Sequence, residues 1–456
     1  MRDVHGSDHA LRRDIRVLGG LLGESLLRQE GPELLELVER VRSLAKAARG
    51  ASSSAARKLD ALLSGLDARR ASLLVRAFSA YFHLANIAEQ LHRADELAQR
   101  SEGSLRATVS NIQEAGIPSE EVAQVLAGTE LRPVLTAHPT EALRRSVLTK
   151  RRRIAQLLEE RSDRSAPPSE RERAEPRLAQ VIDLLWQTDE LRRVRPQPVD
   201  EARSMLFYLD EFFGAVVPEL LEDLVAQLSR LGIDLPLRAR PLRFGTWVGG
   251  DRDGNPTVTP QVTLEVLGLQ REHAVANLVG ALDRLITDLS PSTRIVDITP
   301  ELEKSLAADR EVLPEVYERY QRLNAEEPYR LKCSYIRERL LNSRGRAPGA
   351  PRPVGRDYRS TDELLEDLEV MRTSLVRNRG ELVAAGVLDP VVRVAGCFGL
   401  NLATMDVRRI GHHTGQRIPG PNQVQVDALD ANVTASQRLY VGVVASHERE
   451  RQSGHT

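Results

Sequence analysis

Three clusters of polar residues in this sequence have the types that bind or transform anions, and each follows an apolar, partly β-branched segment. The first contains His138, in the run LTAHPTEALRRSVLTKRRR. An imidazole just before a helix lies near the positive end of the helix dipole, and Arg144 and Arg145 follow within two turns. Such a place suits a phosphate or carboxylate and favours a neutral histidine that can act as a base. Alternatively, His138 is an ordinary core residue and the two arginines lie on a solvated face.

The second cluster is the loop FGTWVGGDRDGNPTVTP at residues 244–260. Its candidate binding residues are Trp247, Gly249, Gly250, Asp251, Arg252 and Asp253. The two glycines permit a tight turn in which the backbone closely approaches its surroundings. The two carboxylates are hydrogen-bond acceptors, and the guanidinium is a fork that can hold an anion. The loop is therefore a candidate ligand site.

A calcium loop is the obvious rival for this segment, and its spacing excludes it. The helix-loop-helix calcium pattern needs Gly at position six and Glu at position twelve. Counted from Asp251, these positions hold Pro256 and Val262. A buried Asp–Arg network that only fixes a turn remains open. The third cluster, MDVRR, contains Arg408, which is either an anion ligand or a surface ion-pair partner.

The elements that must position these clusters are predicted to be short strands between long helices. Residues 131–137, 242–248 and 391–407 have the apolar, partly β-branched character of buried strands. The run after Pro139 has one apolar stripe and predicts a helix to about Arg161, with Thr140 as its cap. Strands separated by helices favour an α/β fold with a parallel sheet or barrel, in which active groups gather where strands end. Three strands cannot close a barrel.

The composition excludes several classes of protein. The 456 residues carry 64 Lys+Arg and 65 Asp+Glu, and the formal charge of −1 gives no electrostatic argument for a nucleic-acid or membrane partner. Two cysteines cannot form a disulfide framework, and the motifs of dinucleotide, P-loop and zinc-protease sites are absent from the sequence. The first residues lack the apolar run of a signal peptide. We therefore expect a cytoplasmic globular protein.

Two of these clusters carry a family resemblance. VLTAHPTEALRRSVLTKRRRI closely resembles the histidine motif of phosphoenolpyruvate carboxylase, and FGTWVGGDRDGNPTVT resembles that family's second signature. Supporting matches are LRRDIRVLGGLLGESLLRQEG, LLWQTDELRRVRPQPVDEAR, EPYRLKCSYIRERL and FGLNLATMDVR. Together they extend over most of the chain from Leu11 to Arg408.

The resemblance implies an α-rich α/β fold, a (β/α)8 barrel with many extra helices that this chain contains only in part. It implies carboxylation of phosphoenolpyruvate by bicarbonate to oxaloacetate and phosphate, with Mg²⁺ or Mn²⁺, in an enzyme that is usually a homotetramer. His138 would be the catalytic histidine and Arg408 the clamp on the substrate phosphate. Trp247 and the loop residues Asp251, Arg252 and Asp253 would shape the substrate site. A sugar-phosphate activator would bind Arg144, Arg145, Arg192 and Arg193.

The differences from the family pattern predict that the chain consists of a family-like segment and an unrelated tail. Residues 1–408 correspond to the N-terminal half of a family member, and the family's metal-binding carboxylates, catalytic lysine and mobile loop belong to the half that is missing, so we expect no metal ligand in this chain. Residues 409–456 do not continue the family's sequence pattern, and a frameshift in the gene is one hypothesis that explains this change. Two other readings stay open: a non-catalytic fragment that acts as a sugar-phosphate-binding or assembly subunit, and a half that pairs with a C-terminal partner.

Overall fold

The computed structural model divides the chain into two compact units. One comprises Met1–Ser104 and Ala142–Arg195, and the other Leu105–Glu141 and Pro196–Thr456. The structure describes residues 4–49, 53–99, 104–136, 144–163, 165, 167–189, 196–252, 255–344, 354–407 and 424–426.

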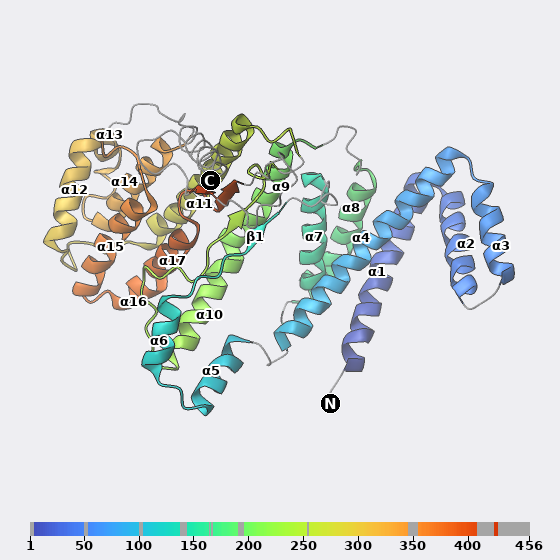
Figure 1. The fold of residues 1–456 in the computed structure, drawn as a ribbon, viewed down its shortest axis with the longest axis horizontal. Helices are drawn as coiled ribbons and strands as arrows, with labels where there is room; N and C mark the ends of the chain where they lie inside the picture. Colours follow the sequence, from blue (N-terminus) through green and yellow to red (C-terminus); the bar gives the residue numbers. More distant parts are fainter. Residues whose placement is uncertain are drawn as a thin grey trace, which may run out of the picture. The chain divides into compact units, whose positions relative to one another are not determined.

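The first unit consists of helices that bury a Leu- and Ile-rich stripe. Its helices are α1 (Val4–Glu30), α2 (Pro32–Arg49), α3 (Ser53–Ser64), α4 (Ala68–Gln99), α7 (Arg145–Ser162) and α8 (Pro168–Trp186) (Figure 1). Leu18, Leu84, Ile154 and Leu178 are almost completely buried in its core. They come from α1, α4, α7 and α8, because an apolar face on each helix must be covered by another helix.

The second unit is built mainly of helices, several of which begin at a proline. Its helical segments are α5 (Leu105–Glu114), α6 (Ser119–Ala127), α9 (Pro198–Glu211), η1 (Phe212–Val216), α10 (Val217–Ser229), α11 (Pro260–Asp288), α12 (Pro300–Val312), α13 (Pro314–Tyr320), α14 (Pro328–Asn342), α15 (Thr361–Arg377), α16 (Glu381–Val383), η2 (Ala384–Leu388) and α17 (Asp389–Phe398). Proline suits the first helical turn because its missing N–H would have no helical partner there. Across the described part of the chain, the structure contains no helix that is both long and apolar enough to span a bilayer.

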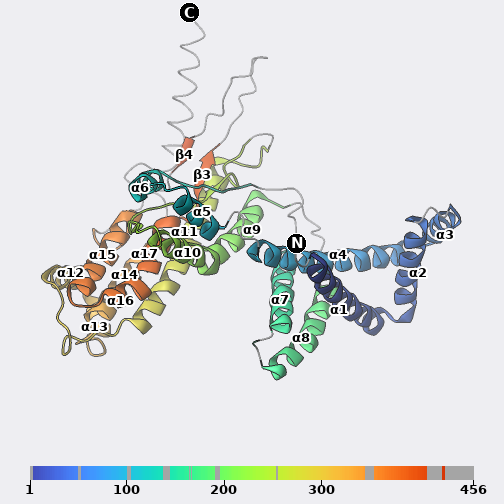
Figure 2. The same ribbon diagram turned by 90° about the horizontal axis from the view of Figure 1, so that it is seen from below.

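A small sheet in the second unit joins segments that are far apart in sequence. Its strands lie in the order β1 (Val134–Leu135), β2 (Gly245–Thr246), β3 (Thr404–Val407) and β4 (Val424–Val426). The first three strands are parallel. Strand β4 pairs with β3 in the antiparallel sense, and Figure 2 shows these two strands side by side. The predicted α-rich α/β character is confirmed, whereas the described residues do not show a (β/α)8 barrel.

The third predicted strand is mostly wrong. Of residues 391–407, only Thr404–Val407 are extended, and the preceding residues belong to α17. The valines there suggested a strand, but their spacing buries one face of a helix that has Pro390 in its first turn. The helix ends at Gly399, whose φ of +58° disfavours any residue with a side chain.

Aromatic rings connect α17 to the sheet. The rings of Phe244 and Phe398 are stacked, with centroids 5.0 Å apart and planes inclined by 11°. Phe212 also stacks on Phe244, with the two ring centroids 5.6 Å apart. Because Phe244 immediately precedes β2, this stack helps to set the position of the strand whose exit carries the Trp247 loop.

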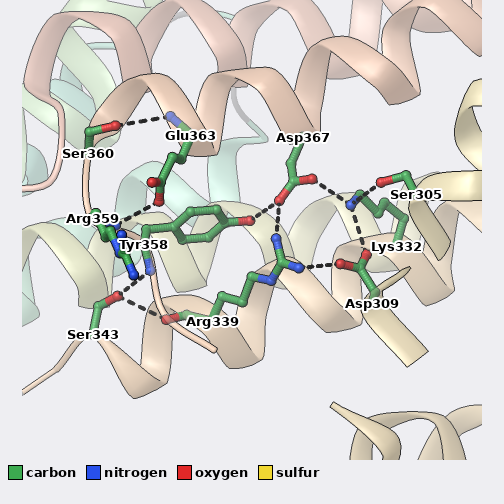
Figure 3. Close-up of polar contacts among 10 residues, drawn as sticks. All are labelled: Ser305, Asp309, Lys332, Arg339, Ser343, Tyr358, Arg359, Ser360, Glu363 and Asp367. Carbon is green, nitrogen blue, oxygen red and sulfur yellow. Dashed lines mark hydrogen bonds and ion pairs between the residues drawn. The ribbon is translucent and has the colours of Figure 1, made fainter. Parts of the chain in front are cut away.

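A charged network is buried among α12, α14 and α15 (Figure 3). Lys332 is completely buried, and its Nζ donates to Asp309 at 2.8 Å and to Asp367 at 2.5 Å. Arg339 forms ion pairs with the same two carboxylates, and the Tyr358 hydroxyl donates to Asp367 at 2.6 Å. Two cations thus balance two carboxylates, which offsets much of the cost of removing these charges from water.

Replacing Lys332 by methionine should strongly destabilise the second unit. The side chains have similar length, but K332M leaves two buried carboxylates with one cation, and we expect a loss of about 3–5 kcal/mol in the free energy of unfolding. Urea unfolding at pH 7.5 measures it. K304M, at an exposed position of α12, the helix that carries Asp309, is the matched control and should change the free energy by less than about 0.5 kcal/mol. Equal effects of the two substitutions would contradict the assigned role of the network.

Both cysteines should make the stability of the chain fall at alkaline pH. Burial raises the pKa of the Cys333 thiol to about 12 and that of Cys397 to about 11, from an ordinary value of 9.0. Above pH 9 the unfolded chain therefore releases thiol protons that the folded chain retains. The free energy of unfolding consequently falls as the pH rises from 9 toward 11–12. The C333A/C397A double variant should lose less stability between pH 8 and pH 10.5 than the parent, as measured by urea unfolding. The same loss in both proteins would show that the thiols do not contribute.

Candidate functional site

The candidate site lies at the edge of the sheet where three parallel strands end. Leu135, Thr246 and Met405 occupy the same level in β1, β2 and β3. The Trp247 backbone N–H donates to the Leu135 carbonyl at 3.0 Å, so the first residue beyond β2 is still held by β1. Residues that follow these strands therefore gather at one edge, the usual place for a ligand in an α/β protein.

The loop after β2 folds back on itself. The Trp247 carbonyl accepts hydrogen bonds from the backbone N–H groups of Gly250 and Asp251, both at 2.9 Å. Thr263, near the start of α11, donates its hydroxyl to the Gly249 carbonyl at 2.7 Å. Both ends of the turn are thus fixed by hydrogen bonds. This arrangement keeps the half-buried Trp247 side chain at the strand exit.

The two glycines of this loop have no space for a side chain. Gly249 has a φ of +82°, and a Cβ built there would lie 2.8 Å from Val266. A Cβ on Gly250 would lie 2.3 Å from the carbonyl oxygen of Asp406 in β3. The prediction that these glycines permit a tight turn and close backbone approach is confirmed.

Two polar residues of the site were missed in the sequence. The buried Asp406 carboxylate accepts a hydrogen bond from the indole Nε1 of Trp247 at 3.2 Å. The buried Thr246 hydroxyl donates to the Leu135 carbonyl at 3.1 Å and accepts from the Val248 N–H at 3.0 Å. A polar residue inside an otherwise apolar strand was the available signal for both, because a buried polar group needs a partner.

The structure describes only some of the other predicted substrate residues. Asp251 and Arg252 are half-buried in the loop that follows Trp247. His138 follows β1 by three residues in the sequence and Arg408 follows β3 directly, and both, with Asp253, lie outside the described residues. The structure therefore brings together Trp247, its loop and Asp406.

The predicted activator arginines lie at the start of α7 in the first unit. Helix α7 begins at Arg145 with Arg144 as its N-cap residue, later than predicted, and the expected cap residue Thr140 lies outside the described residues. Arg144 donates to Asp189 at 3.5 Å, and Arg145 is exposed. The first turn of α7 contains no acidic residue, which leaves positive charge at the positive end of the helix dipole. Arg192 and Arg193 lie outside the described residues.

The divalent metal that the resemblance implies does not fit the residues seen in this structure. Within the described ranges, no group of three or more His, Cys, Asp or Glu side chains is arranged to hold a metal ion. Mg²⁺ and Mn²⁺ prefer carboxylate and other oxygen ligands, and the described residues of the Trp247 loop assemble no such set.

These features define a class: a helix-rich α/β protein with a Trp- and Gly-containing loop at the carboxyl ends of parallel strands. The chain belongs to the phosphoenolpyruvate carboxylase family, whose model matches residues 11–418.

Named relatives support this assignment. The chain is 38% identical over 416 residues to the phosphoenolpyruvate carboxylase of Roseiflexus castenholzii, covering 88% of this chain and 44% of the relative. It is 36% identical over 416 residues to that of Pseudomonas aeruginosa, covering 88% and 45%. The enzyme of Xanthomonas oryzae pv. oryzae matches over 438 residues at 34% identity, covering 94% and 48%. The chain thus spans just under half the length of these curated relatives.

Alanine at Gly249 should destabilise the second unit, whereas alanine at Gly268 should not. G249A combines left-handed backbone strain with a clash against Val266, and we expect a loss of roughly 2–5 kcal/mol. Gly268 lies within α11 with no atom within 4 Å of an added Cβ, so G268A should stabilise by about 0.5–1 kcal/mol. Thermal and urea unfolding measure both. A G249A variant as stable as the parent would contradict the tight contact.

Proposed function

We propose that this chain contributes part of the active site for carboxylation of phosphoenolpyruvate by bicarbonate, which yields oxaloacetate and phosphate. The observation that carries the proposal is the family match over residues 11–418, which includes all three strand exits. The parallel sheet supports it, because the family's histidine motif, its second signature and the MDVR segment each include residues of one of three parallel strands, which end at one edge.

In the proposed reaction, the phosphoryl group moves from phosphoenolpyruvate to bicarbonate, which leaves the enolate of pyruvate and carboxyphosphate. Carboxyphosphate releases carbon dioxide and phosphate, and the enolate carbon attacks the carbon dioxide. We assign to His138 the delivery of carbon dioxide to the enolate and to Arg408 the binding of the substrate phosphate, a role that suits a guanidinium fork. Trp247 and its loop would form the wall of the substrate site.

The proposal places this activity in a protein that also contains the sequence that the relatives carry beyond the matched region. A bound divalent cation would compensate the charge of the enolate, and we assign its ligands to that further sequence. We also propose the cytoplasm as the location and a homotetramer as the assembly. This chain's own share is the binding of phosphoenolpyruvate and the orientation of the groups around it.

The decisive variant is H138N. We expect the 456-residue chain mixed with the C-terminal half of the Roseiflexus castenholzii relative to form oxaloacetate, detected by coupling to malate dehydrogenase with Mg²⁺ present. H138N should lower the rate by roughly 10²–10⁴-fold, the range for loss of a group that assists proton or group transfer. H447N, outside the matched region, is the control and should retain the parent rate.

Two results of this assay would contradict the proposal. One is the absence of oxaloacetate when both halves are soluble and folded, and the other is an unchanged rate in H138N. A second candidate function, a non-catalytic sugar-phosphate-binding or assembly subunit, is favoured by the positive charge at the start of α7. Calorimetric binding of a sugar phosphate that is lost in the R144A/R145A variant, without any oxaloacetate formation, would support this second function.

A further inference from the structure

We propose that Asp406 is a positioning residue that sets the orientation of Trp247 and of the turn that follows it. This inference rests on the proposed function, which places Trp247 in the wall of the substrate site. Asp406 lies in β3, and only 4% of its surface is exposed. Its Oδ2 accepts the indole N–H of Trp247 at 3.2 Å.

The main chain of Asp406 makes the second contact with the same loop. Its carbonyl oxygen would lie 2.3 Å from a Cβ on Gly250, so at this point the loop backbone touches the strand directly. Gly250 in turn donates its N–H to the Trp247 carbonyl at 2.9 Å. One residue of β3 therefore contacts the loop at both ends of the turn, through its side chain at the indole and through its main chain at Gly250.

The burial of the carboxylate supports a specific role. A buried carboxylate loses its hydration, and an apolar side chain would cover this part of the sheet at lower cost. What the carboxylate provides is direction, because the indole has a single N–H donor and its χ2 angle is otherwise broadly distributed. Asp406 also lies two residues before Arg408, the proposed phosphate ligand, in the sequence.

The orientation of Trp247 can be measured without any activity. The sequence contains two tryptophans, so W186F leaves Trp247 as the single fluorescent indole of the full chain. In this background, D406A should shift the emission to longer wavelength and increase the acrylamide quenching constant by roughly twofold, because the ring loses its hydrogen bond and gains contact with water. D406N keeps a side-chain carbonyl acceptor and should restore values close to the parent.

The control is D389N, which changes another buried aspartate of the same unit. Asp389 pairs with Arg372 and contacts neither Trp247 nor its loop in the described interactions, so D389N should leave the emission unchanged. A second test is independent of the carboxylate. The methyl group added in G250A would overlap the Asp406 carbonyl oxygen and should also shift the Trp247 emission, whereas the methyl group added in G268A meets no neighbouring atom and should leave the emission unchanged. G250A decides the question if D406A does not fold. Unchanged Trp247 emission in folded D406A, or in folded G250A if D406A is unfolded, overturns the inference.

Substrate measurements separate this inference from the proposed function. In the assay with the C-terminal half, D406A should raise KM for phosphoenolpyruvate roughly tenfold, the factor for one lost hydrogen bond, with a smaller change in kcat. D406N should recover most of this loss. If phosphoenolpyruvate neither binds nor reacts with the parent but D406A still shifts the emission, the proposed function fails and the positioning by Asp406 is supported. A fall in kcat alone with normal Trp247 emission counts against Asp406 as a positioning residue.

Discussion

The close approach of the loop after β2 to β3 is the constraint on which the candidate site depends. At Gly250 the two backbones are too close for any side chain, and at Gly249 the turn needs a φ of +82°. The hydrogen bond between Trp247 and Asp406 joins the same two segments, which the pairing of β2 with β3 brings together.

The helices of the second unit are joined by two kinds of interaction. Stacked rings of Phe212, Phe244 and Phe398 join helical segments to the residue before β2, and their burial provides non-directional stabilisation. The network around Lys332 contributes directional contacts among α12, α14 and α15. A buried charge has few favourable arrangements, so such a network selects one packing of the helices more sharply than an apolar core does.

Prediction from sequence succeeded where a local pattern had one physical meaning. The loop glycines before Asp251 indicated a close approach of the backbone, and the structure shows it at Gly249 and Gly250. It failed where local signals conflict. The valines of α17 have the branched side chains of a strand, but they lie on a helical face that is covered by the rest of the unit, and burial outweighs the weak intrinsic preference of valine for strands.

The sequence by itself determined the residue types at the strand exits, the helical character of most of the chain and its family, because motifs and apolar periodicity are properties of neighbouring residues. Only the tertiary structure decided which residues meet. Asp406 and Trp247 are separated by 159 positions, and their hydrogen bond depends on the pairing of β2 with β3. No local pattern encodes such a contact, because strand register is set by the packing of the whole unit and not by the residues that finally touch.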